Sequence, residues 1–110
     1  MRIVHNGPIV INVYATIGDN VDIYQNTTIG SMFLKAAQIG NNVYIGPSVC
    51  IVEDVKIGDG VTIGAGAVIV KDVEAGTTVA GNPAKVISHK EPGRLVWRRW
   101  NREWNKYNKK

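Results

Sequence analysis

Isoleucine recurs at every sixth position along most of this chain. A small or branched residue follows four places after nearly every member of the series, as Val21 follows Ile17 and Val61 follows Ile57. A period of six matches neither the 3.6 residues of a helical turn nor the strict alternation of a half-buried strand, so each hexad predicts a short strand with a corner. The series comprises Ile11, Ile17, Ile23, Ile29, Ile39, Ile45, Ile51, Ile57, Ile63 and Ile69, and Ala75 continues it.

A longer period lies over the hexads. Residues 17–21, 39–43 and 57–61 resemble one another most, and their starts are 22 and then 18 residues apart. Three hexads therefore complete one circuit, which predicts an all-β parallel β-helix with isoleucine columns inside and Gly, Asn or Asp at the corners. The four extra residues within 31–36 must loop outward, and their apolar members, Met32, Phe33 and Leu34, predict burial against a neighbouring subunit.

Composition places this solenoid in one small domain. The chain has 110 residues, and no apolar run approaches the ~20 residues of a membrane-spanning helix. A lone Cys50 allows no intrachain disulfide, and the first residues lack the pattern of a secretory signal, so we expect a soluble cytoplasmic protein. Residues 1–89 carry five basic and seven acidic side chains, whereas 90–110 carry eight and two. We therefore divide the chain into a β-helix domain, 1–89, and a basic tail, 90–110.

Three segments carry a family resemblance. Residues 5–12, 17–21 and 79–87, with the repeated pattern [Ile/Val]-Gly-x-x-[Val/Ala/Thr]-x, resemble the hexapeptide repeat of the left-handed β-helix acyltransferases. Within that group the chain looks most like serine acetyltransferases and the related enzymes that O-acetylate capsular saccharides. The left-handed sense is implied by this resemblance, because parallel crossovers are otherwise right-handed in ~98% of cases.

The resemblance implies transfer of an acetyl group from acetyl-CoA to an acceptor hydroxyl. His5 stands where the family has its general base, directly before Asn-Gly-Pro-Ile-Val-Ile. The Asp that precedes this His in serine acetyltransferases is Val4 here, and their Arg-His pair aligns with Lys35-Ala36. Without these charged groups a saccharide hydroxyl is the preferred acceptor. Serine O-acetylation, amino-sugar N-acetylation and a non-catalytic trimeric scaffold are the alternatives.

For acetyl-CoA as co-substrate, the resemblance implies a groove between subunits of a homotrimer. Ala65 and Pro47 would lie against the pantetheine arm, Val70 and Lys71 would follow it outward, and Lys71 and Lys85 would pair with the phosphates. The alternative is that both lysines are ordinary surface residues and that Ala65 only packs a corner.

The remaining polar groups favour no other chemistry. Two histidines, His5 and His89, are too few for the three-histidine zinc site of some β-helices, so no metal is expected. Cys50 has no activating base nearby in the sequence, which argues against a catalytic thiol.

Aromatic residues of the tail recur at helical spacing. After Pro92-Gly93 they predict a C-terminal helix with one aromatic face, which packs on the β-helix or another subunit, or else contacts an anionic membrane surface. Nucleic-acid binding is not expected, because the acidic body offers no continuing basic track. The aromatic residues are Trp97, Trp100, Trp104 and Tyr107.

Overall fold

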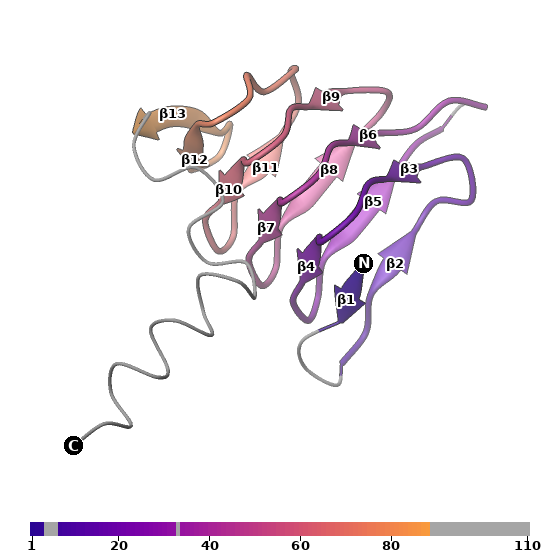
Figure 1. Ribbon diagram of the computed structural model, residues 1–110. Coiled ribbons are helices and arrows are strands. Elements are labelled where there is room, and N and C mark those ends of the chain that lie inside the picture. Colours follow the sequence, from indigo (N-terminus) through magenta and orange to yellow (C-terminus); the bar gives the residue numbers. More distant parts are fainter. Residues whose placement is uncertain (4–6, 33, 89–110) are drawn as a thin grey trace.

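The protein is a three-sided prism built from short strands. A computed structural model describes residues 1–3, 7–32 and 34–88 (Figure 1). Sheet A has the order β1-β4-β7-β10-β12-β13, sheet B the order β11-β8-β5-β2 and sheet C the order β3-β6-β9. The strands are β1 (Arg2–Ile3), β2 (Val10–Ile11), β3 (Thr16–Ile17), β4 (Asp22–Ile23), β5 (Thr28–Gly30), β6 (Gln38–Ile39), β7 (Tyr44–Ile45), β8 (Cys50–Val52), β9 (Lys56–Ile57), β10 (Thr62–Ile63), β11 (Val68–Ile69), β12 (Thr78–Ala80) and β13 (Lys85–Ser88).

The hexad isoleucines form the core, as the period predicts. Parallel pairing places Ile29 beside Ile51 and Ile51 beside Ile69, so each sheet has its own column of inward isoleucines. From Ile23 onward these side chains are buried, and valines such as Val43 and Val61 fill the corners between columns. Stacking identical branched side chains about 4.8 Å apart removes a continuous apolar surface from water, which stabilises the stack of coils.

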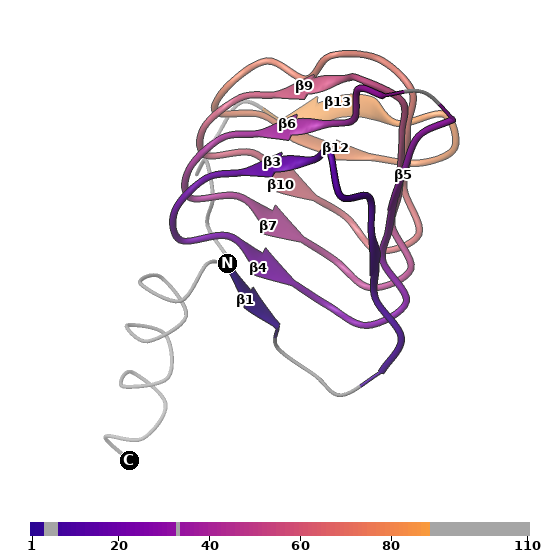
Figure 2. The same cartoon turned by 90° about the vertical axis from the view of Figure 1, so that its right-hand side faces the viewer.

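The coil is left-handed. Figure 2 views the prism from its N-terminal side, and the chain runs from β4 to β5 to β6 counterclockwise as it recedes from the viewer. The prediction of a left-handed parallel β-helix is therefore confirmed.

The last circuit is two residues shorter than the repeat predicts. Val73 bridges to Ile57, and Val79 pairs with Ile63, each 16 residues further along the chain. The prediction that Ala75 continues the isoleucine column is therefore wrong, since Val73 occupies that place. The next corner follows the shortened register, because Gly76 stacks on Gly60 with a similar positive φ, 76° against 72°, and its N–H donates to the Asp59 carbonyl oxygen.

The extra residues after β5 loop outward, as expected. Pairing across this loop joins residues 22 apart, such as Thr16 and Gln38. Met32 and Leu34 are 87% and 76% exposed, and Phe33 lies outside the described residues. Buried Ala37 ends the loop, and its carbonyl oxygen accepts from the N–H of Thr16.

At its C-terminal end the prism is closed by an antiparallel strand, because β13 pairs with β12. The predicted helical tail, 90–110, lies outside the described residues, and the domain division at residue 89 remains a prediction. Among the described residues there is no helix with the length and apolar character needed to cross a bilayer.

Candidate active site

The corner between sheets A and B lines up two of the predicted coenzyme residues. Since Ile23, Ile45 and Ile63 are in register, the residues two places after them, Gln25, Pro47 and Ala65, lie on successive coils. Backbone hydrogen bonds link these coils, from the Ser48 N–H to the Gln25 carbonyl oxygen (3.0 Å) and from the Gly66 N–H to the Pro47 carbonyl oxygen (2.9 Å). Pro47 and Ala65 therefore share one edge of the prism.

This edge is smooth and faces open space. A Cβ at Gly46 would lie 3.0 Å from the Ala65 backbone nitrogen, so the coils approach closely there. At Gly66, where φ is +73°, an added Cβ would meet no atom within 4 Å. Ala65 is exposed and Pro47 is half-buried, so an extended ligand can lie against the backbone along this edge.

His5 lies outside the described residues, but the chain on both sides of it is placed. Ile3 pairs with Ile23, and the Pro8 carbonyl oxygen accepts from the Asn26 N–H at 2.7 Å. A Cβ at Gly7 would lie 2.8 Å from the Cβ of Gln25. The described residues that flank His5 in the sequence, Ile3 and Gly7, therefore lie close to Ile23 and Gln25, at the N-terminal end of the same edge.

Gln25 is a further candidate for this site, which the sequence pattern did not single out. Its Oε1 is buried and has no hydrogen-bond partner among the described residues, and its Cβ lies close to Gly7. The available signal was positional, because Gln25 stands two places after an inward isoleucine, as Pro47 and Ala65 do.

The other predicted coenzyme residues gather at the C-terminal end of the prism. Val70 and Lys71 line a cavity of about 60 Å³ together with Ala84. The Ala84 N–H donates to the Val68 carbonyl oxygen at 2.9 Å, so this turn lies beside β11. Lys71 and Lys85 are both exposed, Lys71 after β11 and Lys85 in β13.

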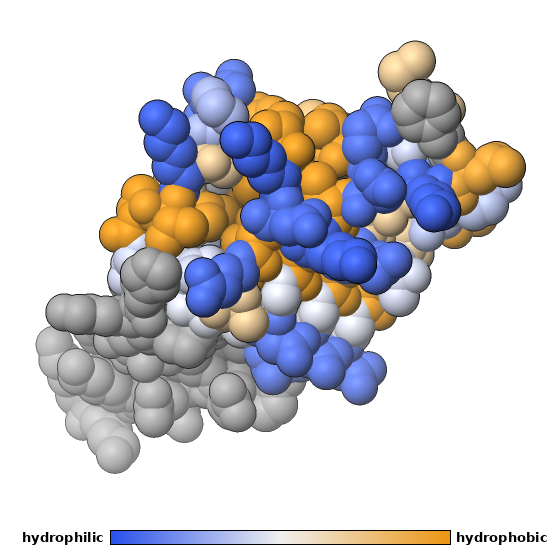
Figure 3. Space-filling model, turned by 90° about the horizontal axis from the view of Figure 1, so that it is seen from above, coloured by the Kyte–Doolittle hydropathy of each residue, from blue (hydrophilic) through white to orange (hydrophobic). Residues whose placement is uncertain are grey.

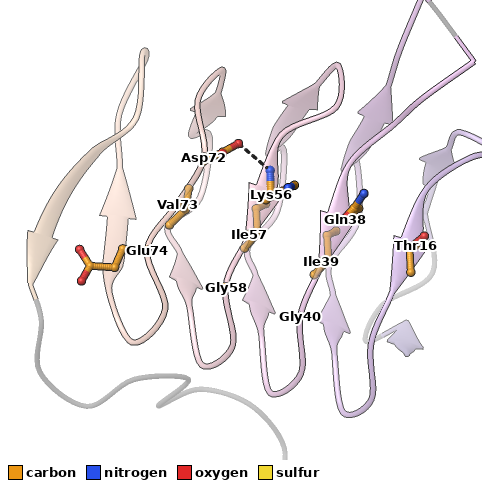
Figure 4. A pocket seen from close by; sticks show the side chains of 10 residues that line it. All are labelled: Thr16, Gln38, Ile39, Gly40, Lys56, Ile57, Gly58, Asp72, Val73 and Glu74. Atoms are coloured by element: carbon orange, nitrogen blue, oxygen red, sulfur yellow. Dashed lines mark hydrogen bonds between the residues drawn. The ribbon is translucent and has the colours of Figure 1, made fainter.

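A larger trough lies over the outer face of sheet C and contains none of the predicted site residues. Its volume is about 700 Å³, and Figure 4 shows Thr16, Gln38 and Lys56 on neighbouring strands along it. The Lys56 backbone N–H donates to Asp72 Oδ1 at 2.8 Å. Figure 3 looks onto this side of the molecule and shows hydrophilic side chains gathered over it. The trough is open and mixed in charge, which favours no particular ligand.

Burial shapes the electrostatics of the outer face of sheet A. Arg2 forms a 2.8 Å ion pair with the buried carboxylate of Asp22. The rings of Tyr24 and Tyr44 lie 5.1 Å apart. Burial, followed by the proximity of Tyr24 and Asp22, raises the pKa of Tyr44 well above its ordinary value. Tyr44 is therefore a protonated phenol at neutral pH and does not supply a base.

Metal-ligating side chains do not cluster in the described part of the chain, where no three of His, Cys, Asp and Glu come together. Cys50 is a free, half-buried thiol on the outer face of sheet B.

Known proteins share both the repeat and the fold. Residues 36–71 match the family described as bacterial transferase hexapeptide (six repeats). The chloroplastic serine acetyltransferase 1 of Arabidopsis thaliana is 43% identical over 91 residues, which cover 79% of this chain and 29% of that protein. The structure of soybean serine acetyltransferase complexed with serine has a TM-score of 0.75 and 36% identity, over 78% of this chain and 37% of that one.

A second structure, serine acetyltransferase in complex with coenzyme A from Brucella abortus, has a TM-score of 0.73 and 31% identity, and covers 79% of this chain and 36% of that one. The chain thus spans about a third of the length of each of these three proteins. Repeat, fold and relatives together identify the chain as a hexapeptide-repeat protein whose β-helix is similar to that of serine acetyltransferases.

Proposed function

We propose that this chain transfers an acetyl group from acetyl-CoA to the hydroxyl of serine, with His5 as general base. The observation that carries the proposal is the likeness to serine acetyltransferases over most of the chain, in sequence and in fold. The sequence alone favours a saccharide hydroxyl as acceptor, because Val4 and Lys35-Ala36 replace charged residues of those enzymes. The relatives favour serine, which was an alternative acceptor in the sequence-based prediction. A saccharide hydroxyl becomes the competing acceptor.

The chemistry requires a base because a neutral hydroxyl is a weak nucleophile. An imidazole with a pKa near 6.5 is largely neutral at pH 7 and can accept the hydroxyl proton. The serine oxygen then forms a bond to the thioester carbonyl carbon, and the C–S bond of the tetrahedral intermediate breaks. The imidazolium of His5 returns the proton to the departing thiolate, so O-acetylserine and coenzyme A are released and His5 is neutral again.

The edge between sheets A and B fits the donor. An extended pantetheine arm would lie against the backbone at Ala65 and Pro47, with its thiol end toward Gln25 and the segment of His5. The exposed ammonium groups of Lys71 and Lys85 would face the phosphates. A second subunit would close this groove in the homotrimer that the family resemblance implies.

Release of coenzyme A thiol tests the proposal. We expect turnover with L-serine that exceeds turnover with N-acetylglucosamine, glucosamine or an uncharged oligosaccharide. Replacement His5→Gln should lower kcat by about 10²- to 10⁴-fold, the usual contribution of a general base. The matched control is His89→Gln, which changes the other histidine of the chain and should leave kcat unchanged.

Each part of the proposal has its own contrary result. Faster turnover with a saccharide would reassign the acceptor, and full activity of the His5→Gln variant would reject the base. A folded chain that transfers acetyl to none of these acceptors would support the non-catalytic scaffold instead.

A further inference from the structure

Much of the outer face of sheet A is covered, at β4, β10 and β12 in particular, whereas the outer face of sheet C is exposed. Side chains alternate between the two faces of a strand, so the residue before each inward residue points away from the core. On sheet C these outward residues, Thr16, Gln38 and Lys56, are exposed. On sheet A, Arg2 is exposed and Tyr44 is half-buried, but the outward residues Asp22, Thr62 and Thr78 are buried, with exposed fractions of 1%, 3% and 7%.

Two hydroxyl groups on this covered face have no partner. Thr62 and Thr78 are paired on neighbouring strands, β10 and β12. The Oγ1 atom of each is buried and has no hydrogen-bond partner among the described residues. Buried hydroxyls are rarely left unpaired, because their desolvation is then uncompensated. Whatever covers sheet A is therefore expected to bring hydrogen-bonding groups to this pair.

The C-terminal segment has the position and the length to be that cover. β13 is the last strand of sheet A, and its Ser88 pairs with Thr78. A helix over residues 94–110 would be roughly 25 Å long at about 1.5 Å per residue. The distance across six strands is also roughly 24 Å, at about 4.8 Å per spacing. The chain thus leaves the prism at one end of the covered face with enough residues to cross it.

The aromatic residues of this segment can supply the apolar surface and the hydrogen-bond donors that the outer face of sheet A lacks. Trp97, Trp100 and Trp104 fall on one helical face, and each combines a large apolar ring with a single N–H donor. A threonine Oγ1 can accept from an indole N–H. We propose that residues 94–110 form a helix that packs its aromatic face across the outer face of sheet A, over Thr62 and Thr78, in the same chain. Basic residues of the segment, such as Arg98 and Arg102, then face solvent.

Tryptophan fluorescence of the full chain tests this packing directly, because all three tryptophans lie in this segment. We expect emission that is blue-shifted relative to the urea-unfolded chain, shielded from acrylamide and independent of protein concentration. Thr62→Lys should shift the emission to the red and restore quenching. The matched control, Gln38→Lys on the exposed face of sheet C, should change neither, and far-UV circular dichroism verifies the fold of both variants.

Thiol labelling provides a second measurement that does not depend on the lysine variant. With Cys50→Ser removing the native thiol, Thr62→Cys should react with a soluble maleimide far more slowly than Gln38→Cys. Replacing the three tryptophans by serine should raise the rate at Thr62→Cys to that of Gln38→Cys. Equal rates with the tryptophans intact would overturn the proposal.

Two other occupants would give different results. Shielding that appears only as the protein concentration rises would show that the segment packs on another copy. Emission that shifts to the blue only when phosphatidylserine vesicles are added would show a membrane contact. Either result would overturn packing within the chain.

Discussion

Tyr44 keeps its proton because the side chain is half-buried beside a second phenol and a carboxylate. Its ring contacts Tyr24, and Asp22 lies on the next strand of the same sheet face. Burial, the first of these causes, disfavours the phenolate, and the negative charge of Asp22 adds to that effect. The folded chain therefore holds this proton more tightly than the unfolded chain, in which the pKa of a tyrosine has its ordinary value of 10.0.

This difference predicts a loss of stability at alkaline pH. Below the unfolded value of 10.0 the phenol is protonated in both states, and its contribution to stability is complete. Above that pH the unfolded chain releases the proton first, so the free energy of unfolding should fall. Urea titrations between pH 8 and pH 11 should show a steeper fall for the native chain than for Tyr44→Phe. Lysines titrate in both the native chain and the Tyr44→Phe variant, so they do not cause a difference between the two. An identical fall of the free energy of unfolding with pH in both would contradict the burial of Tyr44.

At the same scale, the sequence predicted which residues share an edge of the prism better than it predicted surfaces. Pro47 and Ala65 could be placed on one edge because each stands two positions after an inward isoleucine. Gln25 obeys the same rule but was overlooked, since a glutamine carries no distinctive chemistry. The trough over sheet C is formed by side chains from several circuits, such as Gln38 and Lys56, whose types follow no pattern along the chain.

At the scale of the elements, glycines set how closely successive coils approach. A Cβ at Gly58 would lie 2.6 Å from the Ala75 nitrogen and 2.7 Å from its Cα. These are backbone atoms of the next coil, so they cannot move aside without opening the stack. At Gly30 the nearest atom to an added Cβ is Thr28 Cγ2 at 3.7 Å, which is ordinary contact.

The two glycines therefore predict opposite effects of the same substitution. Gly58→Ala should destabilise the chain by about 1–3 kcal/mol, as overpacking does. Gly30→Ala should be neutral or should stabilise it by up to about 1 kcal/mol, because alanine restricts the unfolded chain. Chemical denaturation of both variants measures the difference. Equal destabilisation would show that the coils are not spaced as described.

The period of six predicted most strands well. It failed in the last circuit, where either Val73 or Ala75 could take the inward position. The isoleucines from Ile23 to Ile69 fill the columns that the repeat assigned to them. In the last circuit, Ala75-Gly76 resembles the start of another hexad, yet Val73 takes the inward place. A two-residue shortening leaves the pattern of small and branched residues nearly unchanged, so the sequence alone could not distinguish the registers.

At the scale of the whole molecule, one corner of the N-terminal half exposes apolar side chains. Met32 and Leu34 project from the loop after β5, and Val13 and Tyr14 lie on the neighbouring coil, where Asn12 Nδ2 reaches the Ser31 carbonyl oxygen. Apolar side chains that gather on a surface mark contact sites. We expect this corner to be buried between copies of the chain in the proposed homotrimer.

The assembly prediction is tested by mass in solution. Light scattering after size exclusion should give three times the 12.0 kDa of one chain. Replacing Met32 and Leu34 together by serine should lower this mass. Ile87→Ser, which changes an exposed isoleucine at the other end of the prism, should not. A native mass of a single chain would contradict the trimer.

The position of bound coenzyme A tests the central claim most directly. A crystal structure of the full chain with coenzyme A should place the pantetheine arm along Pro47 and Ala65, with the thiol beside Gln25 and His5. Density for the coenzyme in the trough over sheet C, or a thiol at the opposite end of the prism from His5, would contradict the proposed site.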